Sequence, residues 1–174
     1  MRRHSRESGN LFKWIPGQAG DDKEILRRSA SRSIILMEKT VVLIKPDGMK
    51  KKIVGKIIDR FERSGLELVG LKLINLTQEM LNDWYSHHKD KPFFSDLAHF
   101  MRETPVVAMV LMGENAVSRV REIIGPTDST KAMKGTIRGD FGDDVQRNVV
   151  HASDAAERAK FEIKMLFKTQ EIFT

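Results

Sequence analysis

The sequence contains no cysteine. This absence excludes a disulfide scaffold, cysteine-ligated zinc and iron–sulfur sites, and a cysteine nucleophile. No apolar run approaches the roughly 18 residues that a membrane span needs. With 40% hydrophobic and 31% charged residues and a mean hydropathy of −0.37, the composition is that of a globular protein rather than a disordered or collagen-like one. At 174 residues we expect one domain with its own core.

The net charge is +6, which by itself favours a nucleic-acid or anionic-surface partner. The distribution of this charge weakens that interpretation. Residues 1–36 contain eight basic and four acidic residues and so contribute +4, whereas residues 37–174 contribute only +2. The sequence therefore describes a nearly balanced body with a basic arm.

The first 36 residues differ in composition from the rest of the chain. Ser, Arg and Gly recur there without a helical or strand period, and residues 14–17 (WIPG) are typical of a turn. We interpret residues 1–36 as an N-terminal extension, disordered or a non-native start, before a domain at 37–174. Two origins stay open: an organellar transit peptide, which the arginines and serines favour and the acids oppose, and translated repetitive intergenic DNA, which residues 5–23 resemble. The apolar run at 34–37 is too short for a secretory signal, and we expect a cytoplasmic protein that starts naturally at Met37.

Alternating and helical apolar patterns predict the elements of the body. Strands are expected at 40–44, 66–76, 105–112 and 148–151, with helices at 53–64, 78–88, 93–102, 115–124 and from Ser153 or Asp154 to 167. A turn is expected at 45–48 (KPDG), and the polar stretch before residue 146 is long enough to be functional. This order predicts an α/β fold (an α+β sandwich): a ferredoxin-like split β-α-β with a four-stranded antiparallel sheet covered by helices and an inserted helical pair.

Five histidines are candidates for chemistry. His4 lies in the arm, and His87, His88 and His99 fall in predicted helices, where a surface role is the ordinary one. Adjacent helical positions point about 100° apart, so His87 and His88 cannot share a metal ion. His151 differs because it follows a strand and precedes a helix, where free backbone N–H groups and the helix dipole favour an anion.

Other residues give His151 a phosphate-binding context. Lys45, Arg121, Arg138, Thr127 and the hydroxyl of Ser153 supply the positive charge and the donors that a polyphosphate needs. A neutral imidazole is a usable nucleophile at pH 7. Phosphate binding without catalysis is the milder alternative. The sequence lacks a P-loop, a G-x-G-x-x-G loop, the protein-kinase motifs and a G-x-S-x-G elbow.

Residues 148–154 read NVVHASD, which matches the N-x-x-H-[GA]-S-D active-site signature of the nucleoside diphosphate kinases. Further matches to this family are KPDG at 45–48, PFF at 92–94, GPT at 125–127 and GTIRGDF at 135–141. The resemblance extends over essentially all of residues 37–174.

The resemblance implies transfer of the γ-phosphate of a nucleoside triphosphate, usually ATP, to nucleoside diphosphates. The expected mechanism is ping-pong through a phosphohistidine on His151, which would maintain the NTP and dNTP pools. The catalytic residues that it implies are His151, Lys45, Glu162 and Ser153, with Glu162 orienting the imidazole. By the same likeness, nucleotide binding would use Lys45, Tyr85, Phe93, Arg121, Thr127, Arg138, Val145 and Asn148.

Within that set, Asn148 and Lys45 would hold sugar hydroxyls, and Phe93 and Val145 would enclose the base. The resemblance implies Mg²⁺ held mainly by nucleotide phosphates and water, with no metal site on the protein. It also implies a homo-oligomer, either a hexamer or a tetramer, with no membrane partner and no specific nucleic acid. Three positions depart from the family pattern: His87 stands for an acid, Lys91 for an arginine, and Ser129 for a proline that supports subunit packing.

Two alternative functions compete with this one. A ferredoxin-like nucleic-acid-binding module would use the basic arm, but the sequence lacks the aromatic RNA-binding strand motif. A catalytically dead paralogue is disfavoured because every position that the resemblance makes catalytic is filled.

Overall fold

The computed structural model describes residues 37–86 and 91–173. The predicted extension at 1–36 lies outside the described residues, as do His87 and His88. In chain order the elements are β1 (Met37–Ile44), α2 (Pro46–Lys50), α3 (Val54–Arg63), β2 (Glu67–Ile74), α4 (Gln78–Trp84), α5 (Phe94–Met101), β3 (Val106–Glu114), α6 (Ala116–Ile124), the 3-10 turn η2 (Ser129–Lys131), α7 (Ile137–Phe141), β4 (Val150–Ala152), α8 (Ala156–Leu166) and η3 (Thr169–Glu171).

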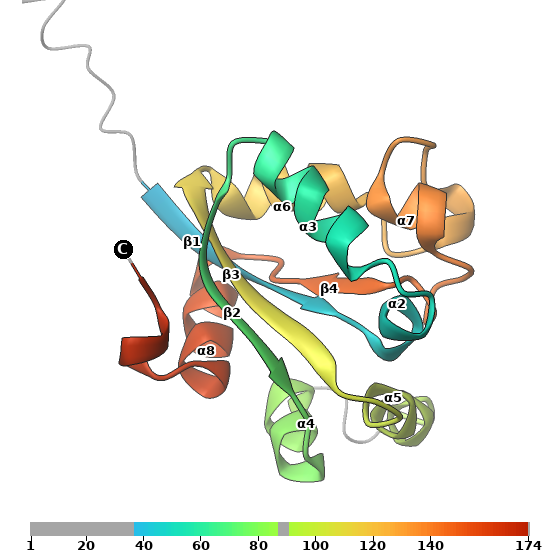
Figure 1. Ribbon diagram of the computed structural model, residues 1–174. Helices are drawn as coiled ribbons and strands as arrows, with labels where there is room; N and C mark the ends of the chain where they lie inside the picture. Colours follow the sequence, from blue (N-terminus) through green and yellow to red (C-terminus); the bar gives the residue numbers. More distant parts are fainter. Residues whose placement is uncertain (1–36, 87–90, 174) are drawn as a thin grey trace, which may run out of the picture. The chain divides into compact units, whose positions relative to one another are not determined.

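The described residues form a four-stranded sheet with the order β2-β3-β1-β4. Every neighbouring pair is antiparallel. Two β-α-β units therefore interleave, since β2 flanks β3 on the side opposite β1 and β4 flanks β1 on the side opposite β3. This topology confirms the predicted split β-α-β fold, and Figure 1 shows β1 and β3 in the middle of the sheet.

Helices cover both faces of the sheet. Val42 and Ile44 of β1 belong to one buried cluster, which α3 and α6 complete, whereas Val41 and Leu43 belong to a second cluster with α4, α5 and α8. Figure 1 shows these two groups of helices on opposite sides of the strands. Because a central strand must bury both faces, its sequence is an unbroken apolar run rather than an alternating one.

The edge strand β2 is a strand as predicted, but its apolar side chains are not all buried. Its pairing with β3 shifts register between Leu68 and Gly70, so that the strand contains a bulge. Val69 is 5% exposed, while Leu71 and Leu73 are 50% and 61% exposed. The bulge changes which face each later residue occupies, and simple alternation could not reveal it.

Some of the predicted helix boundaries agree with the structure. Thr77 caps α4 by accepting a hydrogen bond from the Met80 N–H, as its position suggested, and Gly65 follows α3 with a positive φ of 77°. The helix expected over 78–88 reaches Trp84. Asn115 is the N-cap of α6, yet it has a left-handed backbone and makes no side-chain cap bond.

Two local predictions were wrong, and one short helix was not predicted. Residues 46–50 form the short helix α2 instead of a simple turn, with Pro46 at the first position, where proline is favoured. The polar stretch before residue 146 contains α7, which Thr136 caps through the Gly139 N–H. Gly113 lies inside β3 rather than beyond its end. These helices are too short for periodicity to detect. Within the described ranges, no helix has the length and apolarity to cross a membrane.

Candidate active site

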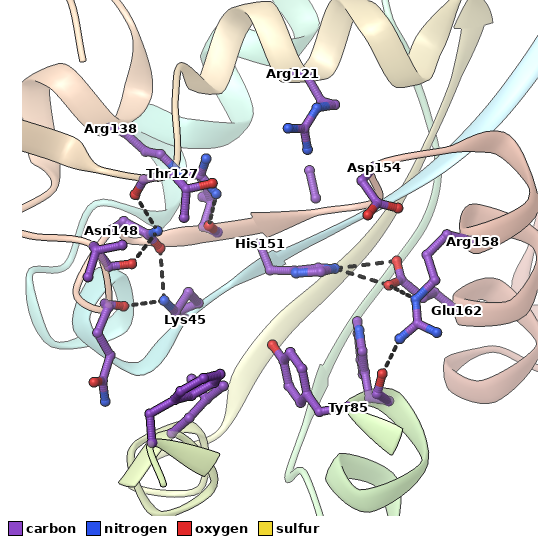
Figure 2. Close-up of a pocket in the computed structure, with 17 residues that line it drawn as sticks. Lys45, Tyr85, Arg121, Thr127, Arg138, Asn148, His151, Asp154, Arg158 and Glu162 are labelled. Carbon is purple, nitrogen blue, oxygen red and sulfur yellow. Dashed lines mark hydrogen bonds and ion pairs between the residues drawn. The ribbon is translucent and has the colours of Figure 1, made fainter. Parts of the chain in front are cut away.

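A pocket of about 640 Å³ opens on the face of the sheet that α4, α5 and α8 cover. Figure 2 shows the His151 ring in its middle, with Lys45 and Arg138 on one side and Glu162 and Arg158 on the other. All but one of the residues predicted from the sequence line this pocket: Lys45, Tyr85, Phe93, Arg121, Thr127, Arg138, Val145, Asn148, His151 and Glu162. Residues up to 117 positions apart in the chain therefore meet at one place.

The pairing of β1 with β4 brings the nucleophile candidate next to the lysine. Leu43 pairs with His151 and Ile44 pairs with Val150, so Lys45 leaves β1 close to the start of β4. Because side chains alternate along a strand, Val150 and Ala152 pack into the cluster with α3 and α6 while the His151 ring points into the pocket, which all three residues line.

His151 is the central residue of β4 rather than the residue at its end. Helix α8 begins only at Ala156, with Ala155 as its N-cap and no side-chain cap bond. The expectation that His151 benefits from a helix N-terminus was therefore wrong, as was the expectation that Ser153 or Asp154 caps the helix. The intervening segment was not recognisable because Ser and Asp are common caps.

Glu162 holds the His151 ring through one of its two nitrogens. The Nε2 atom of His151 lies 3.3 Å from both Oε1 and Oε2 of Glu162. The carboxylate in turn accepts a 2.6 Å hydrogen bond from the Ser153 hydroxyl and a 3.1 Å bond from Arg158 Nε. This arrangement leaves Nδ1 as the ring nitrogen that is not directed at the carboxylate.

Glu162 is fully buried and yet ionised. Burial alone would raise the pKa of its carboxyl, but hydrogen bonds from His151 and Ser153 and the charge of Arg158 lower that pKa below the ordinary value of 4.5. A buried carboxylate at this place favours the ring tautomer with hydrogen on Nε2. The remaining lone pair is then on Nδ1.

Ser153 is the one predicted site residue that does not line the pocket. It is fully buried, and its oxygen also accepts a 3.2 Å hydrogen bond from the Val41 N–H. This differs from the expectation that its hydroxyl contributes directly to phosphate binding. Ser153 follows the end of β4, where its N–H donates to the Val41 carbonyl at 3.1 Å and its hydroxyl donates to Glu162, so its side chain lies in the packing between β1 and α8.

The end of α4 supplies two aromatic rings to the site. Trp84 meets the His151 ring edge-on, with centroids 5.0 Å apart and planes at 88°. Figure 2 shows the hydroxyl of Tyr85 directed into the pocket. Burial and the nearby charge of Glu162 raise the pKa of Tyr85 to about 12, so its hydroxyl keeps its proton at neutral pH.

Lys45 is anchored at the loop end of the pocket. Its Nζ donates to the Asn148 side-chain oxygen at 2.8 Å and to the Gln146 carbonyl. Burial lowers the pKa of Lys45 from 10.5 to about 8, although Asp47 nearby opposes this effect. The ammonium is therefore charged at pH 7, and a phosphate group would stabilise it further.

Arg138 is a second buried cation on the same side. It donates to the carbonyls of Gly125 at 2.9 Å and Val150 at 3.0 Å, and it is 5% exposed. Burial and the neighbouring Arg121 lower its pKa to about 10, which leaves it charged at neutral pH. With Lys45 and Arg121 in the same pocket, the positive charge is suited to a polyanion.

The backbone immediately before β4 is strained. Val149 has a φ of 59°, an unfavourable value for a β-branched residue. Its N–H donates to Asp47 Oδ2 and its carbonyl accepts from the Lys45 N–H, both at 2.9 Å. Such strain is common where a backbone must position functional side chains, and here Asn148 and Val150 flank the strained residue and both line the pocket.

Phe93 and Val145 stand at the pocket mouth, where they are 50% and 60% exposed. Two apolar side chains so open to solvent are suited to a flat apolar ligand group. Lys91, one of the departures from the family pattern, is exposed and lies outside the pocket lining. Ser129, another departure, is buried in η2.

Sequence reasoning missed seven of the residues that line the pocket: Trp84, Leu97, Gln146, Val150, Ala152, Asp154 and Arg158. Arg158 precedes Glu162 by four positions, a spacing at which helical side chains pair, and this signal could have found it. Asp154 is the last residue of the signature matched at 148–154, which could have found it, whereas Trp84 carries no comparable signal. In the part of the chain that the structure describes, no three His, Asp or Glu side chains cluster so as to hold a metal ion.

Comparison with known proteins gives consistent results. A family model described as nucleoside diphosphate kinase matches residues 38–172. A nucleoside diphosphate kinase of Staphylothermus marinus is 51% identical over 135 residues, covering 78% of this chain and 96% of that protein.

Two solved structures agree with this match. The nucleoside diphosphate kinase of Aquifex aeolicus superimposes with a TM-score of 0.76 at 46% identity, covering 79% of this chain and 99% of that one. The enzyme of Halobacterium salinarum, solved in complex with CDP, gives a TM-score of 0.77 at 39% identity, covering 80% and 93% of the two chains.

Proposed function

The chain belongs to the nucleoside diphosphate kinase family and transfers phosphate between nucleotides, and from this premise we propose that His151 carries the phosphoryl group between donor and acceptor. The observation that supports this proposal most directly is the pairing of His151 Nε2 with the buried Glu162 carboxylate. That contact leaves Nδ1 directed away from the carboxylate, in a pocket that contains Lys45, Arg121 and Arg138.

The first half-reaction forms a bond between Nδ1 of His151 and the γ-phosphorus of a nucleoside triphosphate. The bond between that phosphorus and the bridging oxygen breaks, and the nucleoside diphosphate leaves. The Nε2–H stays hydrogen-bonded to Glu162, which stabilises the positive charge that the ring acquires. In the second half-reaction a terminal oxygen of a bound diphosphate attacks the same phosphorus, and the N–P bond breaks to restore neutral His151.

Three cations are proposed to hold the phosphates during both half-reactions. Lys45, Arg121 and Arg138 line the pocket, and phosphoryl transfer depends mainly on positioning and on stabilising charge in the transition state. The Thr127 and Tyr85 hydroxyls add neutral donors. One pocket that serves donor and acceptor in turn predicts ping-pong kinetics.

The sugar and the base are assigned to the outer part of the pocket. Asn148 and Lys45, which are hydrogen-bonded to each other, are proposed to bind sugar hydroxyls. Phe93 and Val145 offer apolar surfaces for the base, and stacking of this kind does not discriminate between bases. The CDP complex of the halophilic relative is consistent with such a site, and we propose ATP as the usual donor with broad acceptor specificity that maintains the NTP and dNTP pools.

Mg²⁺ is the proposed cofactor, held mainly by the phosphates. Mg²⁺ usually keeps several waters and needs only one or two protein carboxylates when phosphates are present. Apart from Glu162, the carboxylate that lines the pocket is Asp154, which fits this role through Mg²⁺-bound water. When bound, the ion would neutralise phosphate charge and orient the transferring group.

We also propose a homo-oligomer, a hexamer or a tetramer. Its support is the edge strand β2, on which Leu71 and Leu73 are exposed, because unpaired edges with apolar side chains are associated with subunit contacts. Native mass spectrometry measures the subunit number, and a monomer would contradict this proposal. We place the enzyme in the cytoplasm, where nucleoside triphosphates are made and used. A nucleic-acid-binding function is not favoured by the family match.

The proposed function is tested by incubating the protein with ATP labelled at the γ-phosphate. Acid-labile label is expected on His151, and His151→Asn should abolish both the label and phosphate exchange between ATP and diphosphates. His99→Asn is the matched control, since His99 is an exposed histidine of α5 that does not line the pocket. Activity retained in His151→Asn, or label on another residue, would refute the proposal.

A further inference from the structure

Arg158 makes three contacts that link the reacting centre to the helix beside it. Its Nε donates to Oε1 of Glu162 at 3.1 Å, and its terminal nitrogen donates to the carbonyl of Trp84. Its guanidinium lies over the Phe161 ring, 4.8 Å from the centroid. Figure 2 shows it beside Glu162, on the side away from Lys45. A side chain with all three contacts has little rotational freedom.

The first contact fixes the carboxylate that faces His151. Oε1 of Glu162 is bound by Arg158, and Oε2 is bound by Ser153. Both oxygens lie 3.3 Å from His151 Nε2. The carboxylate is thus held from two sides in the orientation that meets the ring, and part of its negative charge is offset by an arginine that is 26% exposed.

The second contact fixes the end of α4. The carbonyls of the last helical turn lack partners within the helix, and Arg158 satisfies the one at Trp84. Trp84 packs its ring against His151, and the next residue, Tyr85, lines the pocket. One guanidinium therefore joins the carboxylate partner of His151 to the aromatic wall around it.

We propose that Arg158 is a positioning residue for phosphoryl transfer, which holds Glu162 against His151 and limits the negative charge that the ring experiences. The inference rests on the proposed role of His151. Without the arginine, the full charge of Glu162 would favour the doubly protonated imidazolium, in which a proton occupies Nδ1 and blocks attack on phosphorus.

Other charged or titratable groups also face this centre, from every element around it. They are Lys45 at the end of β1, Tyr85 at the end of α4, Arg121 of α6, Arg138 of α7 and Asp154 after β4. A substitution at position 158 leaves all five in place. A change in the pH dependence of the Arg158 variant is therefore attributable to the missing guanidinium.

The test measures the single-turnover rate of His151 phosphorylation by ATP from pH 6 to pH 9. Arg158→Met keeps an apolar stem and removes the charge. Its rate is expected to fall about fivefold at pH 6.5 and to return to within about twofold of wild type at pH 8.5, because the acid limb moves up by about one pH unit. Arg158→Lys retains a charge beside Glu162 and is expected to restore most of the rate at pH 6.5.

Arg63→Met is the matched control. Arg63 also pairs with an acid four positions away, Asp59, at 2.8 Å, but it lies on α3 and its side chain is 79% exposed. Its pH profile should equal that of wild type. If Arg158→Met does not fold, Arg158→Gln, which can still donate to the Trp84 carbonyl, takes its place in the comparison with Arg158→Lys.

A rate that is unchanged in the neutral variant, or lowered by one factor at every pH, overturns the inference, because a purely structural role has no reason to depend on proton competition at His151. Equal loss in Arg158→Lys and the neutral variant overturns it as well. Failure of the proposed function looks different, since the wild-type protein itself would then carry no label on His151.

Discussion

The buried ammonium of Lys45 predicts that this protein gains stability when the charge is removed. Lys45 is 6% exposed, and burial lowers its pKa from 10.5 to about 8. A difference of this size corresponds to about 3 kcal/mol at ~1.4 kcal/mol per pKa unit. The folded state bears this cost below pH 8, where lysine is protonated in both the folded and the unfolded chain.

The direction of this pH dependence follows from which state of the chain keeps the Lys45 proton. Between pH 8 and 10.5 the unfolded chain keeps the proton and the folded chain does not, so the contribution of Lys45 to the free energy of unfolding becomes more favourable as pH rises. In Lys45→Met this contribution is absent. The free energy of unfolding of Lys45→Met minus that of wild type should therefore fall by about 3 kcal/mol from pH 7 to pH 10.5.

Urea unfolding of both proteins at several pH values measures this change. Lys45→Met also removes two hydrogen bonds, to Asn148 and Gln146. Any difference in their strength between the ammonium and the neutral amine is already contained in the pKa shift, so the pH trend still measures that shift. Lys160→Met, at an exposed lysine of α8, is the control and should give a constant difference. A difference for Lys45→Met that is constant within about 0.5 kcal/mol from pH 7 to pH 10.5 would refute the reasoning.

Ser153→Ala should cost about 1–3 kcal/mol of unfolding free energy, because a buried carboxylate and a buried backbone N–H each lose a partner, and should lower kcat; urea unfolding and steady-state assays measure both. Phe93→Ala should raise KM about tenfold for every diphosphate alike, since a stacking surface is worth about 1–3 kcal/mol for any base; a panel of four diphosphates checks this. Gly139→Ala should lower the melting temperature strongly, because an added Cβ would lie 2.0 Å from a backbone oxygen, whereas Gly55→Ala, which meets nothing within 4 Å, should raise it. Deletion of residues 1–36 should leave activity and melting temperature nearly unchanged in a matched pair of assays.

For each of these four predictions, one outcome would contradict the reasoning. Unchanged kcat in the serine variant would contradict the role of the hydroxyl beside Glu162. A base-dependent change in KM for Phe93→Ala would show that the ring reads base identity. A stable Gly139→Ala protein would contradict the close packing there, and a large loss of activity on truncation would show that the extension is part of the enzyme.

Much of the fold could be predicted from the chain alone. The apolar runs of β1 and β3 identify buried strands, and the helical rhythm from Ile53 to Phe61 identifies α3. The features that the sequence patterns did not predict are short or irregular: α2, α7 and the bulge in β2. A helix of five residues has too few positions for a period, and a bulge depends on the partner strand.

The identities of most site residues were predicted through a resemblance to a known family. The geometry of the site was not predicted. No spacing rule could place Glu162 beside Nε2 of His151, because that contact depends on how α8 packs against β1 and β4. Nor could a pattern show that Ser153 turns inward, or that Trp84 meets the imidazole.

The amino-acid sequence by itself determined which segments are apolar, how the elements alternate and which reactive side chains exist, since these depend on local chemistry. Only the tertiary structure decided which of those side chains meet, how deeply each is buried and therefore which charges are perturbed. Distance and desolvation arise when segments far apart in the chain pack together, and they set both the hydrogen-bonded carboxylate at Glu162 and the destabilised ammonium at Lys45.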